Sequence, residues 1–341
     1  MLPSESMLEY GAPEPGDDND PRLTTAFVAL VLAFLGMMAI FYAGWMLSER
    51  YSWRFQQFPD VAKADWCARI TSTIHASLVC LLAVICIATT DFDSNTLVPK
   101  GSTLLIRITF SISIGYFLFD QVIILWWMMP SWFAFSVHHV IAMCPYVITQ
   151  FFYDCHSGQY VLLLFLLLEL SVIPLDIMAF LEDSGYRDTR AHVAVHLVMY
   201  LTWLGCRVGL PIYILVVIWG KVVDQLEDEL PCLLPIVICG HIFALFTIGV
   251  FLFVITPEAY IRMRYGDLMI EENGLENGNY DTPGGFLGFS GPLDSDEVAA
   301  PYRDLGSIAE SPAASQDDVK FTATDPEAVD DKMQAELLPR S

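Results

Sequence analysis

Long apolar runs alternate with short polar stretches along the first 260 residues of the chain. A helix needs about 20 apolar residues to cross roughly 30 Å of hydrocarbon. Runs of at least this length cover residues 23–47, 66–90, 104–129, 132–153, 160–181, 193–219 and 230–255. The pattern therefore predicts an all-α integral membrane protein with seven transmembrane helices.

The third and fourth runs are separated only by Pro130 and Ser131. Proline has no backbone N–H and disrupts the interior of a helix. We therefore predict a tight hairpin at this point and not one very long helix. The hairpin makes the number of spans odd, which places the two ends of the chain on opposite sides of the membrane.

Basic residues in the short loops predict which loops are cytosolic, because Lys and Arg accumulate on the cytosolic side of a membrane. With the N-terminus outside, seven basic residues fall in inside segments: Arg50, Arg54, Lys63, Arg187, Arg190, Arg262 and Arg264. Three fall in outside segments: Arg22, Lys100 and Lys221. This bias predicts an N-out, C-in topology.

The two ends of the chain are acidic. Residues 1–22 are rich in Pro and lack the cationic and apolar regions of a signal peptide, so we expect a flexible N-terminus. From Asp267 onward there are 17 acidic and four basic residues, which account for more than half of the net charge of −23. Too few apolar residues are present there to offset the entropy of ordering, so residues 265–341 are predicted to be a disordered cytosolic tail. The chain has no basic face for nucleic acid, and we expect no such partner.

Eight cysteines raise the question of disulfides. Six of them lie inside apolar runs, where a thiol packs as a small hydrophobic group. Cys155 and Cys232 lie at the ends of runs instead, and a disulfide between them is left open.

Ionisable side chains within the spans are the candidate functional residues, because charges are costly in hydrocarbon and usually face a bundle interior. At a rise of about 1.5 Å per residue, one set lies roughly 8 to 14 Å from the cytosolic ends of its spans. This set comprises His75, Asp120, His138, His139 and Asp176. A second set lies deeper, at roughly 18 to 21 Å on the same rise, and comprises Glu169, Arg207 and His241.

Spacing adds to this picture, since Tyr116 precedes Asp120 by four residues and shares its helix face. We interpret the shallower set as a functional cavity, with hydrogen bonding between helices as the alternative for any single histidine. In the deeper set we predict an ion pair between Glu169 and Arg207, with His241 nearby. The histidines are too few and too scattered for a di-iron centre, and no metal is expected.

Five stretches carry a resemblance to a known family. They are Trp-Cys-Ala-Arg-Ile-Thr-Ser-Thr-Ile-His-Ala at 66–76, Ser-Ile-Gly-Tyr-Phe-Leu-Phe-Asp at 113–120, His138-His139, Glu-Leu-Ser-Val-Ile-Pro at 169–174, and Cys-Arg-Val-Gly-Leu-Pro at 206–211. Their order and content resemble the TLC-domain family, which includes ceramide synthases, translocon-associated proteins and regulators of membrane lipid composition. The resemblance covers about residues 60–260, so the helix at 23–47 is expected to be an addition to the domain.

The resemblance implies a ring of six helices around a cavity that opens toward the cytosol and the membrane. It also implies the endoplasmic reticulum as the usual location, with the plasma membrane as the alternative. Ceramide synthases use paired histidines to transfer an acyl group from acyl-CoA to a sphingoid amine. By this resemblance His138, His139, Asp120 and Asp176 are candidate catalytic residues, and His75, Tyr116, Glu169, Arg207 and His241 are polar residues of the cavity or the scaffold.

One departure separates the chain from ceramide synthases. Their His-Asp-x-x-Asp cluster is missing, because no His-Asp dipeptide occurs in the sequence. The run Glu169-Leu-Ser-Val-Ile-Pro174-Leu-Asp176 is closer to smaller family members that are linked to phospholipid composition and fluidity. We therefore expect a protein that handles lipids or regulates membrane lipid composition, with membrane lipids or fatty-acyl groups as partners and no cofactor.

Other functions stay open or are excluded by motifs. An acyl-CoA-dependent N-acyltransferase that uses His138 and His139 is one alternative, with acyl-CoA as substrate, and a proton-coupled transporter is another. The third span ends in Trp-Trp-Met-Met and not in Asp-Arg-Tyr, which argues against a G-protein-coupled receptor. The seventh span has no lysine for a retinal Schiff base. Homo-oligomerisation is left open.

Overall fold

The computed structural model describes residues 21–152, 156–187, 189–227, 229–257, 259 and 260. The predicted flexible N-terminus, apart from its last two residues, and the predicted tail at 265–341 lie outside these residues. Within them, seven helical stretches are long and apolar enough to cross a membrane, which confirms the predicted all-α membrane fold. These seven stretches are Arg22–Tyr51, Asp60–Thr89, Leu104–Trp127, Trp132–Phe151, Gln159–Asp183, Arg190–Gln225 and Leu230–Ile255.

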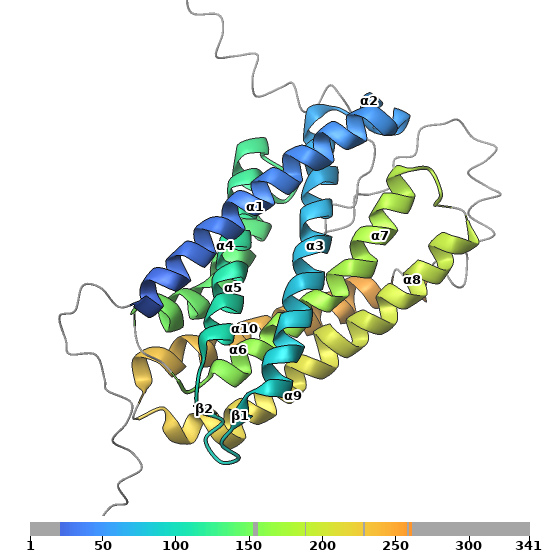
Figure 1. Cartoon of the computed structure of the whole chain (residues 1–341). Helices are drawn as coiled ribbons and strands as arrows, with labels where there is room; N and C mark the ends of the chain where they lie inside the picture. Colours follow the sequence, from blue (N-terminus) through green and yellow to red (C-terminus); the bar gives the residue numbers. More distant parts are fainter. Residues whose placement is uncertain (1–20, 153–155, 188, 228, 258, 261–341) are drawn as a thin grey trace, which may run out of the picture. The chain divides into compact units, whose positions relative to one another are not determined.

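The first four spans are mostly regular α-helices (Figure 1). They are α1 (Pro21–Tyr51), α3 (Asp60–Thr89), α4 (Leu104–Trp127) and α5 (Trp132–Val147), with a short α2 (Trp53–Gln57) after the first. The predicted hairpin between the third and fourth spans is confirmed. Met128 and Ser131, on either side of it, adopt left-handed backbone conformations with φ of 46° and 58°, and α4 packs against α5.

The last three spans are interrupted by 3₁₀ and π-helical segments. The fifth consists of α6 (Gln159–Leu166), the 3₁₀ segment η3 (Leu167–Ser171) and α7 (Val172–Asp183). The sixth consists of α8 (Arg190–Trp203), the π segment η4 (Leu204–Gly209), α9 (Leu210–Val217), the π segment η5 (Ile218–Val222) and the 3₁₀ segment η6 (Val223–Gln225). The seventh is α10 (Leu230–Val250) with the π segment η7 (Phe251–Ile255), and α5 also ends in a π segment, η2 (Ile148–Phe152).

Prolines explain three of these interruptions. A proline has no N–H to bond the carbonyl four residues earlier, so the α-helical pattern breaks around that carbonyl. Pro174 leaves the carbonyl of Leu170 in η3, and Pro211 leaves the carbonyl of Arg207 in η4. Pro257 has the same relation to η7. The irregular backbone thus follows from residues in the sequence.

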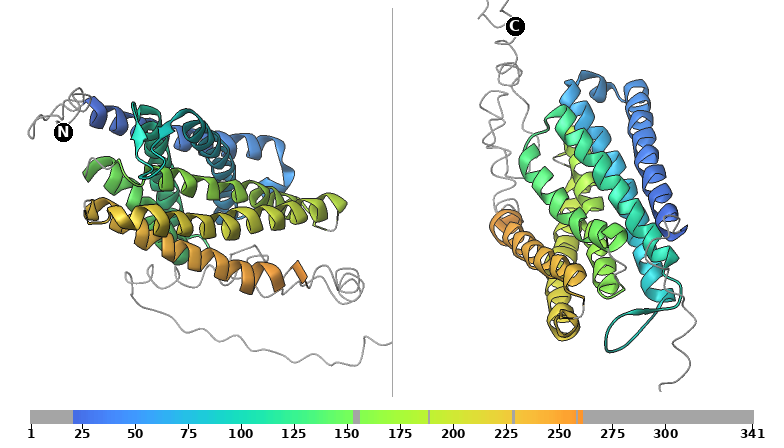
Figure 2. Two further views of the ribbon diagram at one scale, coloured as in Figure 1. Left: turned by 90° about the horizontal axis from the view of Figure 1, so that it is seen from below. Right: turned by 90° about the vertical axis from the view of Figure 1, so that its left-hand side faces the viewer.

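Contacts between spans close into a ring of six helices. In order around the ring, α3 packs on α4, α4 on α5, α5 on α10, α10 on α9, the α9 span on the α6–α7 span, and that span on α3. The first helix lies outside this ring and packs on α3 and α4. As a result α1 and α10 lie on opposite sides of the bundle (Figure 2). This agrees with the six-helix bundle plus one additional helix that the sequence predicts.

Close packing holds α1 against α4. Gly115 of α4 faces the backbone of α1, and a Cβ at this position would lie 2.5 Å from the carbonyl oxygen of Leu30 and 2.9 Å from the Cβ of Ala33. Small residues at a crossing let two membrane helices approach closely. Gly115 therefore sets the distance between the additional helix and the ring.

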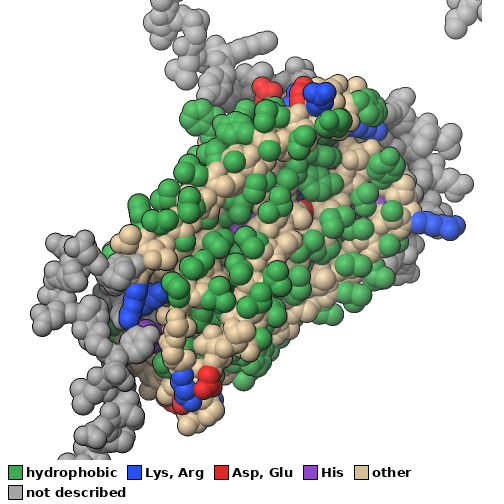
Figure 3. Space-filling view, in the orientation of Figure 1, with side chains coloured by type: hydrophobic (Ala, Val, Ile, Leu, Met, Phe, Trp, Pro, Cys, Tyr) green, Lys and Arg blue, Asp and Glu red, His purple; other side chains and the backbone are tan. Residues whose placement is uncertain are grey.

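Charged side chains gather at the ends of the bundle, and hydrophobic side chains cover the face between them (Figure 3). One end carries Lys63, which pairs with Glu49 at 3.0 Å, and Arg69, which pairs with Asp65 at 2.7 Å. We call this end the Arg69 end. It is the cytosolic end in the predicted topology.

The opposite end is built from loops. Strands β1 (Asp91–Phe92) and β2 (Pro99–Lys100) form a two-stranded antiparallel hairpin with Asp91 opposite Lys100. The hairpin is tied to the sixth span, because Gln225 donates to the carbonyl of Thr96 at 3.0 Å. Gln225 also accepts from Ser157 at 3.0 Å.

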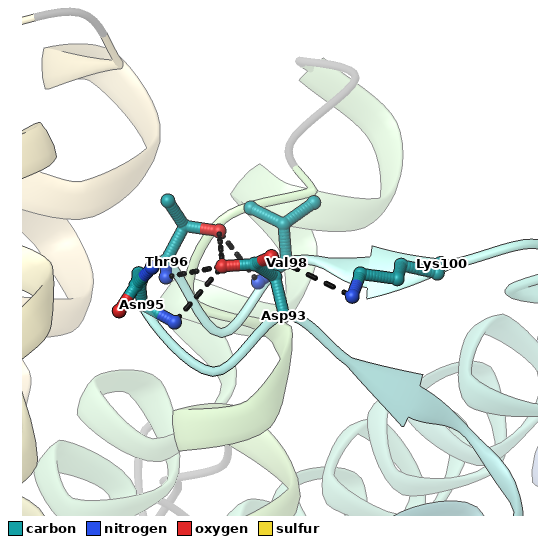
Figure 4. Close-up of polar contacts among 5 residues, drawn as sticks. All are labelled: Asp93, Asn95, Thr96, Val98 and Lys100. Carbon is teal, nitrogen blue, oxygen red and sulfur yellow. Dashed lines mark hydrogen bonds and ion pairs between the residues drawn. The ribbon is translucent and has the colours of Figure 1, made fainter. Parts of the chain in front are cut away.

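Asp93 organises the hairpin loop (Figure 4). Its carboxylate accepts from the backbone N–H groups of Asn95 at 2.9 Å and Thr96 at 3.0 Å, and from the Thr96 hydroxyl at 3.2 Å. Lys100 lies 3.5 Å away. These backbone hydrogen bonds, led by that of Thr96, favour the charged form and lower the pKa of Asp93 to about 2.

Candidate functional site

Four of the five residues in the shallower predicted set lie inside the ring, on α3, α4, α5 and α7: His75, Asp120, His139 and Asp176. Nε2 of His139 lies 3.4 Å from the carboxylate of Asp120, which joins α5 to α4. The ring of His75 on α3 stacks on Tyr116 of α4 with centroids 3.8 Å apart and an angle of 12°. The ring of Phe117 contacts both imidazoles, with its centroid 5.8 Å from that of His75 and 5.6 Å from that of His139.

His75 and His139 both keep buried nitrogens without a protein partner. The side chain of His75 is only 1 % exposed, and neither of its ring nitrogens has a hydrogen bond among the described residues. Nδ1 of His139 is likewise buried and has no hydrogen bond among the described residues. Buried polar atoms are usually hydrogen-bonded, so unpartnered ones in a native protein call for a functional explanation.

Asp176 belongs to the same layer but has other partners. Its carboxylate accepts from Thr73 of α3 at 3.0 Å. From α3 the layer continues to α4, where the ring of His75 stacks on Tyr116. Arg69 is the nearby positive charge. The layer is therefore continuous from α7 through α3 to α4.

His138 points away from this layer. Its ring contacts Phe243 at 5.2 Å and Phe246 at 6.0 Å, both on α10, and it is partly exposed. Phe246 is 44 % exposed and faces the membrane side of the bundle. Adjacent residues of a helix point about 100° apart, and here His138 lies at the α5–α10 seam while His139 faces the interior.

The deeper layer contains the predicted ion pair. Nη2 of Arg207 lies 3.8 Å from Oε1 of Glu169, and Nε of Arg207 donates to Ser171 at 2.8 Å. The prediction is thereby confirmed. Both partners sit in interrupted backbone, Glu169 in η3 and Arg207 in η4. Irregular backbone at membrane depth occurs where it is buried in protein or lines a cavity.

His241 has hydrogen-bond partners other than the ion pair. It accepts a hydrogen bond from Trp219 of η5 at 3.0 Å, and its other ring nitrogen lies 2.8 Å from the carbonyl oxygen of Val237. It is two positions from Cys239 and from Phe243 along α10, a rotation of about 200° that places it on another side of the helix. It therefore joins the sixth and seventh spans and is not part of the ion-pair layer.

A small cavity lies between the two layers. Its lining residues come from α4, α5, α6, η3 and α10, and they include Phe117, Glu169, Cys239 and Phe243. The cavity volume of about 20 Å³ is enough for one water molecule and too small for an acyl chain. Phe243 contacts His138 and also lines the cavity, so it separates the two.

The family of the chain follows from its sequence together with this arrangement. The family model of the TLC domain matches residues 65–255, which is more than half of the chain. The chain belongs to the TLC-domain family. No curated protein and no solved structure is significantly similar to it. The matched TLC domain contains every candidate residue of both layers, whereas α1 precedes it. Membership indicates a function related to membrane lipids.

The TLC domain also contains site residues that the sequence analysis missed. Thr73 donates to Asp176, Ser171 accepts from Arg207, and Arg69 is the positive charge near Asp176. For Arg69 a signal was present, since it follows Asp65 by four residues, the spacing of an ion pair on one helix face. Among the described residues, no group of three or more His, Cys, Asp or Glu is arranged to hold a metal ion.

Proposed function

We propose that this TLC-domain protein acts on the acyl chains of membrane lipids and thereby sets membrane lipid composition. The observation that carries the proposal is the division of the two adjacent histidines. His138 meets the bilayer side at the α5–α10 seam, and His139 meets Asp120 inside the ring. A group that arrives from the bilayer at His138 is thus one residue away from an imidazole held by a carboxylate.

The chemistry of His139 supports acyl transfer as the second candidate. The carboxylate of Asp120, 3.4 Å from Nε2 of His139, favours the tautomer with its hydrogen on Nε2, in which Nδ1 has the free lone pair. Such a nitrogen can take the proton of an attacking amine or hydroxyl, and Asp120 then stabilises the imidazolium. Acyl-CoA would be the acyl donor in this reaction. The cavity does not hold an acyl chain as it stands, so binding requires α5 and α10 to separate.

A transporter has less support. Interrupted helices that meet at mid-membrane, as η3 and η4 do, are typical of transport proteins. The cavity beside them, however, has room only for a molecule the size of water. We keep the endoplasmic reticulum as the proposed location, to be checked by imaging a tagged protein against organelle markers.

The lipid composition of cells with and without the protein tests the proposal. Wild type is compared with His138→Ala, His139→Ala and Asp120→Asn at matched protein levels. His241→Ala is the matched control, because His241 lies outside both layers. We expect the wild type and the control to alter the acyl composition of cellular lipids equally, relative to cells without the protein. The three site variants should leave that composition unaltered.

The kind of change separates the candidates. Altered acyl chains in phospholipids support the regulator of lipid composition, and new ceramides support the N-acyltransferase. If His138→Ala and His139→Ala both retain the full lipid change, the histidine pair is not the site and the proposal fails.

A further inference from the structure

Four exposed arginines at the Arg69 end of the bundle have no carboxylate partner. They are Arg50, Arg54, Arg187 and Arg190, and we call them the arginine rim. No ion pair joins any of them to an acidic residue in the described part of the chain. The first two belong to α1 and α2, and the other two belong to the turn between α7 and α8 and to the start of α8. Figure 1 shows these elements at one end of the bundle.

Arg54 brings the two parts of the arginine rim together. Its guanidinium lies against Gly185 of the α7–α8 turn, where an added Cβ would be 3.0 Å from Cζ of Arg54. Gly185 has a φ of 82°, so glycine both permits this turn and leaves room for the guanidinium. Arg187 follows two residues later, with its Cα at most about 7 Å from that of Gly185. The guanidinium groups of Arg54 and Arg187 are therefore within reach of one ligand.

Thr189 fixes the turn that carries the second part of the rim. Its hydroxyl donates to the carbonyl of Tyr186 at 2.7 Å and accepts from the backbone N–H of His192 at 3.3 Å. The second of these hydrogen bonds caps α8. The positive end of the helix dipole of α8 consequently lies beside the arginines and adds to their attraction for an anion.

Aromatic rings hold two of the arginines by their flat faces. Cζ of Arg54 lies 5.2 Å from the ring centroid of Trp53, and Cζ of Arg50 lies 5.7 Å from that of Tyr51. A guanidinium stacked on a ring still has N–H donors along its edge. Trp53 is 63 % exposed and Tyr51 is 76 % exposed, and exposed Trp and Tyr at the end of a span are typical of the headgroup level of a bilayer. The donors of the rim therefore lie at this level.

Two carboxylates close to the rim in the sequence are engaged with other partners. Glu49 pairs with Lys63 at 3.0 Å, and Glu182 pairs with His192 at 2.9 Å. Asp188 lies outside the described residues. The N–H donors of the rim are therefore available to an anion from outside the described bundle.

We propose that the arginine rim binds the phosphate of an anionic phospholipid in the leaflet at the Arg69 end. Guanidinium groups donate pairs of parallel N–H bonds to phosphate oxygens. In the predicted topology this leaflet is the cytosolic one, where anionic lipids are concentrated. The acidic segment from Asp267 onward is the rival occupant, but the exposed rings of Tyr51 and Trp53 favour the lipid because they place the rim among headgroups. This inference goes beyond the proposed function, since the site contains neither histidine of the pair.

Native mass spectrometry of the full-length protein in detergent tests the site. The protein is titrated with phosphatidylserine or with phosphatidylcholine of the same acyl chains, and the dissociation constant of each lipid is measured. We expect the wild type to bind phosphatidylserine more tightly. Arg54→Gln and Arg187→Gln should each weaken that binding about fivefold, the factor that corresponds to about 1 kcal/mol per arginine, and leave phosphatidylcholine binding unchanged.

Lys221→Gln is the matched control. Lys221 also has no ion pair in the described part of the chain, but it lies in η5, toward the opposite end of the sixth span. This variant should bind phosphatidylserine as the wild type does. Both arginines are exposed, so their variants should keep the unfolding temperature of the wild type, which shows that they fold.

Three results would overturn the site. Equal affinity of the wild type for the two lipids is one, and it would leave the acidic segment from Asp267 onward as the occupant. Equal weakening by Lys221→Gln is another, because it would indicate attraction to any unpaired cation. The third is displacement of phosphatidylserine by an equal concentration of glycerol 3-phosphate, which would assign the rim to free phosphate compounds. The lipid change tested with His139→Ala depends on other residues, so each of these results leaves the proposed function standing.

Discussion

Glu169 and Arg207 form an ion pair at mid-membrane with an N–O distance of 3.8 Å, longer than a close charge-assisted hydrogen bond. The pair is buried, so each charge depends on the other. Removing one partner of a buried pair leaves the second charge uncompensated, which costs more than the pair contributes. Replacing either residue of the ion pair alone should therefore lower the stability of the protein.

We predict that Glu169→Gln lowers the free energy of unfolding by about 1 to 3 kcal/mol, because Arg207 loses its counter-charge. Arg207→Leu added to it should restore part of the loss by removing the orphaned charge. Thermal unfolding in nanodiscs measures both. Glu49→Gln is the control, since the Glu49–Lys63 pair is 46 % exposed on the Glu side and such pairs contribute about 1 kcal/mol or less. A double variant less stable than Glu169→Gln would contradict the prediction.

Asp93 gives a prediction for pH. Its folded-state pKa of about 2 lies below its ordinary value of 3.8, so its contribution to the hairpin loop is complete above the ordinary value. The contribution is lost as the pH falls through about 2. We expect the amide resonances of Asn95 and Thr96 to keep their hydrogen-bonded shifts at pH 4 and to lose them only in this acidic range. In Asp93→Asn the charge is absent, and the same resonances should no longer depend on this titration.

Residues differ in how far the sequence could place them. The depth of Glu169 and Arg207 was enough to pair them, because each is a charge with few alternatives in hydrocarbon. The hydrogen bond of His241 to Trp219 was not predictable, because depth says nothing about which side of a helix a residue faces. The partners Thr73 and Ser171 were missed because small hydroxyl residues are common in membrane helices and carry no signal until a neighbour is known.

At the scale of elements, the α1–α4 crossing depends on one glycine. Gly115→Ala places a Cβ 2.5 Å from a backbone carbonyl of α1, which cannot move aside as a side chain would. We predict a loss of about 1 to 3 kcal/mol in the free energy of unfolding, as for other overpacked sites. Thermal unfolding provides the measurement.

Gly36→Ala is the matched control for this crossing, because its added Cβ meets nothing within 4 Å. The change should leave stability unaltered or raise it by up to about 1 kcal/mol through helix propensity. Equal stabilities of the Gly115→Ala variant and the wild type would show that α1 does not need this close approach.

Span number and order were predictable from hydropathy, but the interruptions inside spans were not predicted. Apolar runs look the same whether the backbone is α, 3₁₀ or π. The prolines at 174, 211 and 257 did indicate where three interruptions lie, since each removes the hydrogen bond to the carbonyl four residues earlier. Segments η2 and η5 have no such proline, and nothing in the sequence pattern explains them.

At the scale of the whole molecule, a disulfide bears on orientation. Cys232 is disulfide-bonded, and the other cysteines among the described residues are free. Cys155, the partner that the sequence suggests, lies outside the described residues. Cys232 lies at the start of α10, at the end opposite Arg69. Disulfides persist in oxidising compartments, so this end should face the lumen or the exterior, in agreement with the bias of basic loop residues.

We predict that in sealed microsomes protease removes a tag placed after Ser341 and leaves a tag placed before Met1 intact. Both tags should be removed once detergent opens the membrane, which is the internal control. Protection of both tags, or cleavage of both, in sealed vesicles would mean that the number of spans is even. The hairpin between α4 and α5 would then be the first boundary to re-examine.

The π segment η4 has a consequence for comparing this protein with its relatives. A π-helical turn holds one residue more than an α-helical turn over the same stretch. Deleting one residue within 204–209 would remove the wider turn and keep the residues beyond it on nearly the same faces of the span, because the π turn already absorbs the extra residue. An alignment of related sequences should therefore show a one-residue gap here, in the middle of a membrane helix, wherever a relative has a regular sixth span.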